Sequence, residues 1–121
     1  MYVKLDKDYE IKTTLGTIRE IERVFGKSFF EIIKDISAMK IDDQIKLLYV
    51  GAKKADDSLK EKDFIAACED NIGIGELIEN LERYFYALQY PGLSEEEVQQ
   101  RIGKKLHQSN LMKQKVLIGS N

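Results

Sequence analysis

Apolar and charged residues alternate at the start of the chain on both sides of an acidic turn. Val3 and Leu5 precede an Asp-rich turn at residues 6–8, and Tyr9 and Ile11 follow it. A period of two is typical of strands, and an Asp-rich tripeptide between two such runs is typical of a turn. The pattern predicts an N-terminal β-hairpin. Because an isolated hairpin is marginal in water, we expect its apolar face to pack on helices.

From Leu15 onward the apolar residues recur with a period of about 3.6, which predicts helices. Gly26 is the residue type that ends a helix, and Ser28 with Glu31 forms a capping box that begins the next one. The side chains predicted to face inward from these two helices are Leu15, Ile18, Ile21, Val24 and Phe25, then Phe29, Ile32, Ile33, Ile36 and Met39.

A third helix is predicted over residues 41–55, and it is apolar nearly all round. Its main stripe consists of Ile41, Ile45, Leu48, Tyr49, Ala52 and Ala55. At 100° per residue, Leu47 and Val50 point roughly opposite to the start of that stripe. Such a helix lies either at the centre of the fold or in an interface, and both interpretations stay open. In the second, Leu47 and Val50 bind another protein.

Two more helices are predicted before Pro91. A second capping box, Ser58 with Glu61, begins a short helix that holds Ile65 and Cys68. The longest amphipathic helix follows, with an inward stripe of Ile74, Leu77, Ile78, Leu81, Tyr84, Phe85 and Leu88.

Tyr86 and Tyr90 lie on the opposite face of that helix, among charged residues. Aromatic side chains away from the core are typical of protein-binding surfaces. They are equally expected as cover for the hairpin or for the last helix, so this alternative stays open.

Pro91-Gly92 ends the long helix, and Ser94 with Glu97 forms a third capping box. The helix after it has only a thin apolar stripe, Val98, Ile102 and Leu106. We therefore predict a mainly α fold with about six short helices in one bundle-like domain, residues 1–106, whose N-terminal hairpin occupies residues 1–14. Residues 107–121 are predicted to be a basic, flexible tail.

Composition agrees with a helix-rich globular protein, since 43% of the residues are hydrophobic and 33% are charged. No apolar run approaches the roughly 18 residues that a membrane span requires. Residues 1–14 contain no continuous apolar segment, and the single cysteine cannot form an internal disulfide. We expect a cytoplasmic protein with neither signal peptide nor lipid anchor.

Charge is unevenly distributed along the chain. Residues 101–121 carry five basic residues and no acidic one, whereas the first hundred residues carry 14 basic and 21 acidic residues. An acidic body argues against a broad nucleic-acid footprint, while a basic tail leaves room for contact with an acidic partner.

The residue types that catalysis and metal binding need are few. His107, the single histidine, has no cysteine near it in sequence, and Cys68 lies on the apolar side of a short helix, where an inert thiol is expected. Gly73-Ile74-Gly75 lacks the third glycine of a phosphate-binding loop and is flanked by acidic residues. The acidic runs lie at helix starts, where the helix dipole favours them. We expect no enzyme, no cofactor, no metal and no small-molecule substrate.

A helix-turn-helix formed by the first two helices is the competing hypothesis, and it predicts a small regulatory or DNA-associated prophage protein. Its second helix would have to offer basic or amide side chains to the bases. Lys34, set against Glu31 and Asp35, is a poor match to that requirement.

The order of these segments resembles the tail assembly chaperones of long-tailed phages and prophages of Gram-positive bacteria. The resemblance covers residues 1 to about 90: a hairpin, Leu15-Gly16-Thr17-Ile18-Arg19-Glu20-Ile21-Glu22, then Phe25-Gly26-Lys27-Ser28, and then the helix that begins at Ile41-Asp42-Asp43-Gln44-Ile45. It contains no catalytic signature.

The resemblance implies a largely helical protein that escorts the tape-measure protein in the host cytoplasm and is absent from the finished virion. It also implies self-association and possible contact with the tail tube protein. A tape-measure protein is a long helical chain with apolar seams, so its escort needs apolar or aromatic faces. Leu47, Val50, Tyr86 and Tyr90 are the residues predicted to form them.

Overall fold

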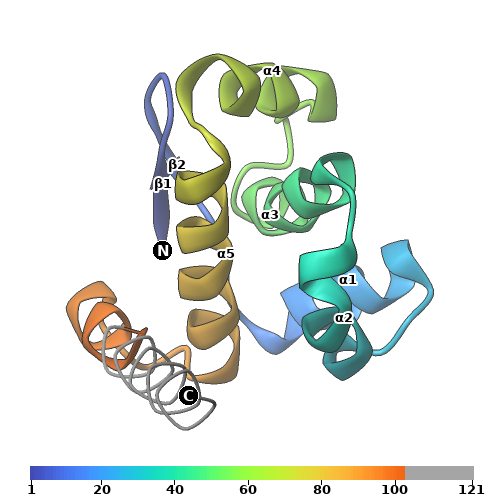
Figure 1. The fold of residues 1–121 in the computed structure, drawn as a ribbon, viewed down its shortest axis with the longest axis vertical. Coiled ribbons are helices and arrows are strands. Elements are labelled where there is room, and N and C mark those ends of the chain that lie inside the picture. Colours follow the sequence, from blue (N-terminus) through green and yellow to red (C-terminus); the bar gives the residue numbers. More distant parts are fainter. Residues whose placement is uncertain (103–121) are drawn as a thin grey trace, which may run out of the picture.

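The computed structural model describes residues 1–102, and helices predominate in it (Figure 1). Two antiparallel strands, β1 (Tyr2–Lys4) and β2 (Asp8–Glu10), form the N-terminal hairpin. The helices are α1 (Leu15–Phe25), α2 (Phe29–Asp35), the short 3-10 helix η1 (Ile36–Ala38), α3 (Ile41–Ala55), α4 (Glu61–Asn71) and α5 (Ile74–Gln89). Residues 95–102 are also helical. The predicted fold class is confirmed.

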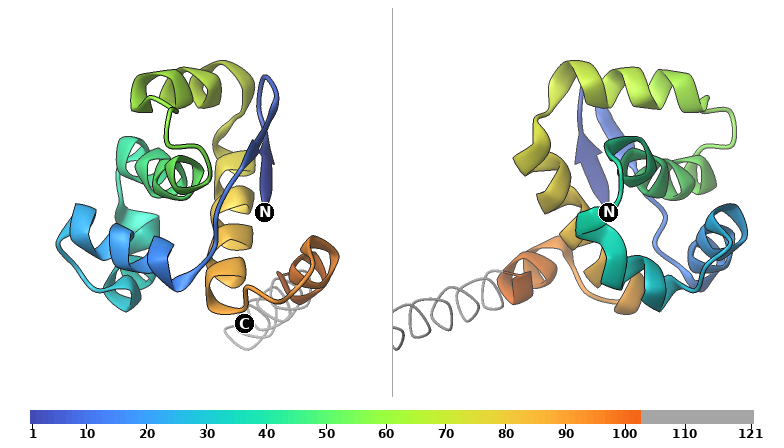
Figure 2. Two further views of the ribbon diagram at one scale, coloured as in Figure 1. Left: turned by 180° about the vertical axis from the view of Figure 1, so that it is seen from behind. Right: turned by 45° about the vertical axis from the view of Figure 1, so that its right-hand side comes forward.

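The hairpin packs its predicted apolar face on the helices. Val3 lies opposite Tyr9 in the register, and Val3 and Ile11 are fully buried. The ring of Tyr9 meets the ring of Phe64 on α4 edge-on, with 5.5 Å between centroids. The backbone N–H of Lys12 donates to the carbonyl of Gly51 on α3, at 2.9 Å. The hairpin also runs alongside α5 (Figures 1 and 2), so three helices supply the cover that two strands lack alone.

The turn between α1 and α2 follows the sequence prediction. Gly26 has φ +67°, a left-handed conformation that only glycine adopts without strain. Ser28 caps α2, because its hydroxyl accepts the backbone N–H of Glu31 at 3.2 Å. Glu22 on α1 accepts the N–H of Phe29 at 2.9 Å. Two side chains therefore satisfy free N–H groups at the start of α2.

α3 is the central helix, which decides between the two interpretations of its all-round apolarity. It packs against α1, α4, α5 and β2 (Figure 2). Leu47 is fully buried and Val50 is 6% exposed. The prediction that Leu47 and Val50 bind another protein is therefore wrong: the residues opposite the main stripe are covered by helices of the same chain.

Gly51 lets α3 come close to both the hairpin and α5. A Cβ at this position would lie 2.5 Å from Cγ2 of Ile11 and 2.8 Å from the hydroxyl oxygen of Tyr84. Real carbon atoms do not approach so closely, so any larger residue would push these elements apart.

The predicted Ser58–Glu61 capping box does not form. The Ser58 hydroxyl donates to the Asp56 carboxylate at 2.6 Å, and α4 begins at Glu61 with Lys60 at its N-cap and no side-chain cap. The Ser58 hydroxyl binds the Asp56 carboxylate instead of capping α4, because a carboxylate two residues away in the sequence allows a compact local turn. The main core residue of α4 is Phe64, which the periodicity analysis did not single out. Cys68 is buried as predicted.

The third capping box is confirmed in its serine half, since the Ser94 hydroxyl accepts the N–H of Glu97 at 3.2 Å. Val98 and Ile102 are buried. Leu106, His107, the predicted domain end at residue 106 and the predicted tail lie outside the described residues.

Candidate protein-binding site

The structure separates the four residues predicted to bind a partner. Leu47 and Val50 belong to the core, Tyr86 is half-buried and Tyr90 is 48% exposed. The guanidinium carbon of Arg101 lies 5.2 Å from the centre of the Tyr90 ring, a cation–π distance. The helical stretch that contains Arg101 thus contacts Tyr90, as the alternative of aromatic cover requires.

Three isoleucines predicted to face inward are instead exposed: Ile41 by 45%, Ile74 by 57% and Ile78 by 44%. Ile41 and Ile74 are the first residues of α3 and α5, and Leu15, the first residue of α1, is 76% exposed. At each of these helix starts the apolar stripe extends past the neighbouring elements that cover the rest of the helix, so its first residue stays exposed. A first-turn position is the feature of the sequence that could have identified Ile41 and Ile74, whereas Ile78 lies one turn further along α5 and has no such signal.

These isoleucines line two adjoining cavities that share Ile41 and Ile74 in their walls. The volumes are about 200 Å³ and about 400 Å³. We call the pair the apolar groove and define it by Met39, Ile41, Ile74, Ile78, Leu81 and Phe85. Residues 36–45, from η1 into α3, form one wall and α5 forms the other, while the end of α4, with Cys68 and Glu69, closes the smaller cavity.

The charged side chains that line the apolar groove are both acidic. Glu69 lines the smaller cavity and Glu82 the larger, and neither cavity is lined by a lysine or an arginine of the described residues. The groove is thus suited to an apolar segment that carries positive charge.

Gln44 fixes the wall between η1 and α3. Its side-chain amide donates to the carbonyl of Ile36 at 2.9 Å and is 6% exposed. Its amide oxygen is buried without a hydrogen-bond partner among residues 1–102. The bond ties the start of η1 to the first turn of α3 and so sets the position of Ile41.

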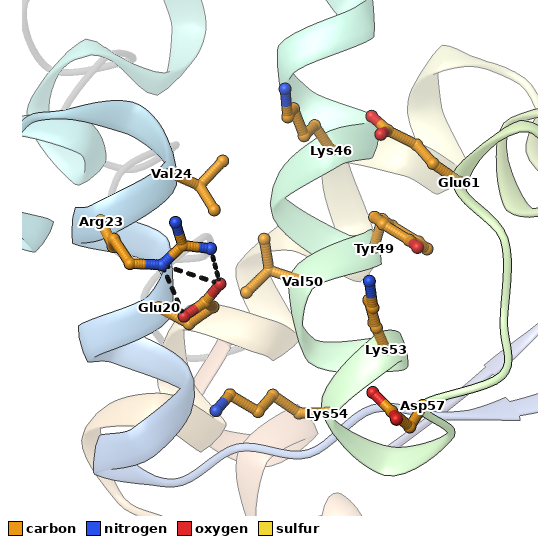
Figure 3. Close-up of a pocket in the computed structure, with 10 residues that line it drawn as sticks. All are labelled: Glu20, Arg23, Val24, Lys46, Tyr49, Val50, Lys53, Lys54, Asp57 and Glu61. Atoms are coloured by element: carbon orange, nitrogen blue, oxygen red, sulfur yellow. Dashed lines mark hydrogen bonds and ion pairs between the residues drawn. The ribbon is translucent and has the colours of Figure 1, made fainter.

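A second hollow, the α1–α3 cleft, differs from the groove in its charge (Figure 3). It has a volume of about 610 Å³ and is lined by four basic and three acidic residues, Arg23, Lys46, Lys53 and Lys54 with Glu20, Asp57 and Glu61. Arg23 and Glu20 pair across one helical turn, and this hydrogen bond holds the pKa of Glu20 below its usual value. Opposite charges are interspersed, so the cleft does not concentrate one sign of charge for an ion.

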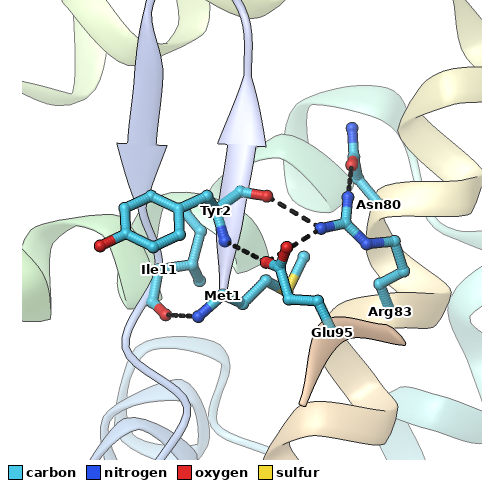
Figure 4. Close-up of polar contacts among 6 residues, drawn as sticks. All are labelled: Met1, Tyr2, Ile11, Asn80, Arg83 and Glu95. Atoms are coloured by element: carbon cyan, nitrogen blue, oxygen red, sulfur yellow. Dashed lines mark hydrogen bonds and ion pairs between the residues drawn. The ribbon is translucent and has the colours of Figure 1, made fainter. Parts of the chain in front are cut away.

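The outer edge of β1 is a third possible docking surface, and the chain itself covers part of it (Figure 4). Arg83 on α5 donates to the carbonyl of Tyr2 at 3.0 Å and to Glu95 at 3.2 Å. Glu95 accepts the backbone N–H of Tyr2 at 2.7 Å. Both outward-facing backbone groups of Tyr2 are therefore satisfied, which blocks strand addition at that residue.

The single thiol of the chain lies inside the hydrophobic core. Cys68 is 2% exposed, and burial raises the pKa of its thiol to about 11, so the thiol stays protonated at neutral pH. Among residues 1–102, no three histidine, cysteine, aspartate or glutamate side chains lie together as metal ligands would. Over the same residues, every helix is too short or too polar to span a bilayer.

No protein-family model, curated protein or solved structure matches the chain. The resemblance to tail assembly chaperones therefore stays a prediction.

Proposed function

We propose that this protein is a non-enzymatic phage or prophage tail assembly chaperone, and that it binds the tape-measure protein through the apolar groove. The class of protein, the tape-measure partner and possible contact with the tail tube protein come from the sequence resemblance. In this proposal the protein acts in the host cytoplasm and is absent from the finished virion.

The apolar groove is the observation that carries the proposal. Three exposed isoleucines, Ile41, Ile74 and Ile78, stand beside a hollow with mostly apolar walls. Exposed apolar patches with this shape are typical of protein-binding sites. Burial of each isoleucine under a partner is favourable by roughly 25 cal/mol per Å² of apolar surface removed from water.

The dimensions of the groove suit a partner helix. Ile74, Ile78, Leu81 and Phe85 follow one side of α5 over 12 residues, and the 11 steps between the first and the last correspond to about 16 Å, or three helical turns. An amphipathic helix places anchors at i, i+3 or i+4 and i+7, which span about 10 Å and therefore fit within this length. A tape-measure protein presents apolar seams of this kind, which is the chemical link between the groove and the proposed partner.

Binding to DNA has no comparable support. In α2, the second helix of the hypothetical helix-turn-helix, the exposed side chains are Phe30, Glu31, Lys34 and Asp35. One basic side chain against two acidic ones would repel the phosphate backbone.

The test is copurification of the full chain with the tape-measure protein encoded beside it. We expect Ile78→Asp to weaken binding at least about tenfold, because a charge would be buried in an apolar contact. Leu15→Asp is the matched control: it places the same charge on an exposed apolar position of α1, away from the groove, and should leave binding unchanged.

Circular dichroism of both variants should show unchanged helical content, since both positions are exposed. Replacing Tyr86 and Tyr90 with Ala tests the two aromatic residues in the same assay. Equal binding by the two aspartate variants, or the lack of a long helical partner, would remove the basis of the proposal. The neighbouring genes offer an independent check, because a tape-measure gene is expected just downstream.

A further inference from the structure

The apolar groove and the C-terminal residues 103–121 have complementary compositions. The groove is apolar, and its two charged lining residues, Glu69 and Glu82, are acidic. Residues 103–121 contain four lysines and no acidic residue. They also contain six large apolar residues, namely Leu106, Leu111, Met112, Val116, Leu117 and Ile118.

This combination meets both requirements of the groove within one segment. Apolar side chains would cover the exposed isoleucines, and lysines would face the two glutamates. The α1–α3 cleft is a poorer match because its three acidic residues stand among four basic ones, so it does not present the purely acidic charge that a basic segment would favour. The edge of β1 beyond Tyr2 would bind another chain through backbone hydrogen bonds, which do not favour lysine over other residues.

The described chain ends on the far side of α5 from the groove. Residues 95–102 lie beside the hairpin at the lower end of α5 (Figure 1), where Glu95 contacts Tyr2 and Arg83. The groove is lined by α5, residues 36–45 and the end of α4, and no residue of 95–102 lines it. A segment that continued from Ile102 would have to pass around α5 to enter the groove of its own chain. The groove of a second copy is reached without that detour.

We propose that the apolar groove of one copy binds the C-terminal segment, residues 104–118, of a second copy. The contact is reciprocal, because each copy has one groove and one such segment. Self-association by this route places an apolar, basic segment where a partner helix would otherwise bind. The groove then has an occupant when no other partner is present.

A charge swap in the full-length chain tests this directly, with no other protein present. One variant carries K104E, K105E, K113E and K115E, and the other carries E69K and E82K. Each alone places like charges on both sides of the contact. We expect each to raise the dissociation constant for self-association about tenfold, measured by sedimentation equilibrium over a concentration series.

Mixing the two variants distinguishes a contact between copies from a contact within one chain. In the mixture, acidic segments of the first variant meet basic grooves of the second, and basic segments of the second meet acidic grooves of the first. Association between the two variants should therefore recover to the wild-type strength. A contact within one chain would stay broken in both, so the lack of recovery would overturn the proposal.

The control for nonspecific charge effects is E76K with E79K. Glu76 and Glu79 are exposed on α5 but do not line the groove, so the charge change is the same and the location differs. This control should associate like the wild type. If it weakens association as much as E69K with E82K, or if the wild type stays monomeric throughout the series, the proposal is wrong. Neither result would bear on tape-measure binding, which the copurification assay measures separately.

Discussion

Arg83 and Glu95 form an ion pair, at 3.2 Å, whose two members each hold one backbone group of Tyr2. The pair joins α5 and the helical stretch 95–102 to the edge of β1, where Tyr2 is 81 residues from Arg83 and 93 from Glu95 in the sequence (Figure 4). Asn80 orients the arginine from one turn away, by accepting a hydrogen bond at 2.9 Å. The contact therefore secures the N-terminal hairpin and the last described helix to the same point of α5.

Arg83→Met should lower the free energy of unfolding by about 1 kcal/mol, because the Tyr2 carbonyl and Glu95 lose a charged partner whose side chain is 17% exposed. Chemical denaturation gives the value. Arg23→Met is the control, since Arg23 pairs with Glu20 at a site where its side chain is 71% exposed, and no measurable change is expected there. Equal losses in the two variants would mean that the Tyr2 contacts add nothing.

Gly51→Ala should destabilise the protein by about 1–3 kcal/mol, because the new methyl group would overlap Ile11 and Tyr84. Gly75→Ala provides the opposite case. Gly75 lies in the first turn of α5 with no atom within 4 Å of the added carbon, so alanine should stabilise the helix by about 0.5–1 kcal/mol. Thermal unfolding of both variants should show shifts of opposite sign.

Tyr84→Phe and Tyr49→Phe should differ although both tyrosines are buried. The Tyr84 hydroxyl is buried near the Gly51 backbone but makes no well-formed hydrogen bond within residues 1–102, so its removal should be neutral or stabilising. The Tyr49 hydroxyl donates to the carbonyl of Leu59 at 2.8 Å, and its loss should cost about 1 kcal/mol. A larger loss for Tyr84→Phe than for Tyr49→Phe in denaturant titrations would contradict the hydrogen bonding seen here.

Stability should fall with rising pH in the alkaline range because of Cys68. Burial raises the pKa of its thiol to about 11 in the folded protein, above the ordinary value near 9. The unfolded chain therefore loses the proton first, and stability that is fully present below pH 9 is lost between about pH 9 and pH 11. Cys68→Ala should remove this contribution from the measured pH dependence. A thiol that reacts rapidly with a maleimide at pH 7 in the native protein would refute the assignment.

Local signals in the sequence were sufficient for most of the secondary structure. The alternation around residues 6–8 located the hairpin, and Gly26, Ser28 and Ser94 marked helix ends, because caps and turns depend on residues within a few positions. The Ser58 cap failed for an equally local reason, since Asp56 offered its hydroxyl a closer acceptor.

By itself, the sequence determined the number and the approximate extent of the helices, the hairpin, and the contrast between an acidic body and a basic C-terminal end. Only the tertiary structure decided which apolar side chains remain exposed to solvent. Leu47 and Val50 lie off the main stripe of α3 but are covered by neighbouring helices, whereas Ile41 and Ile74 belong to stripes and remain exposed at helix starts. Periodicity describes one helix at a time, and burial depends on which elements surround that helix. A binding surface composed of uncovered side chains therefore becomes visible only when all the elements are in place.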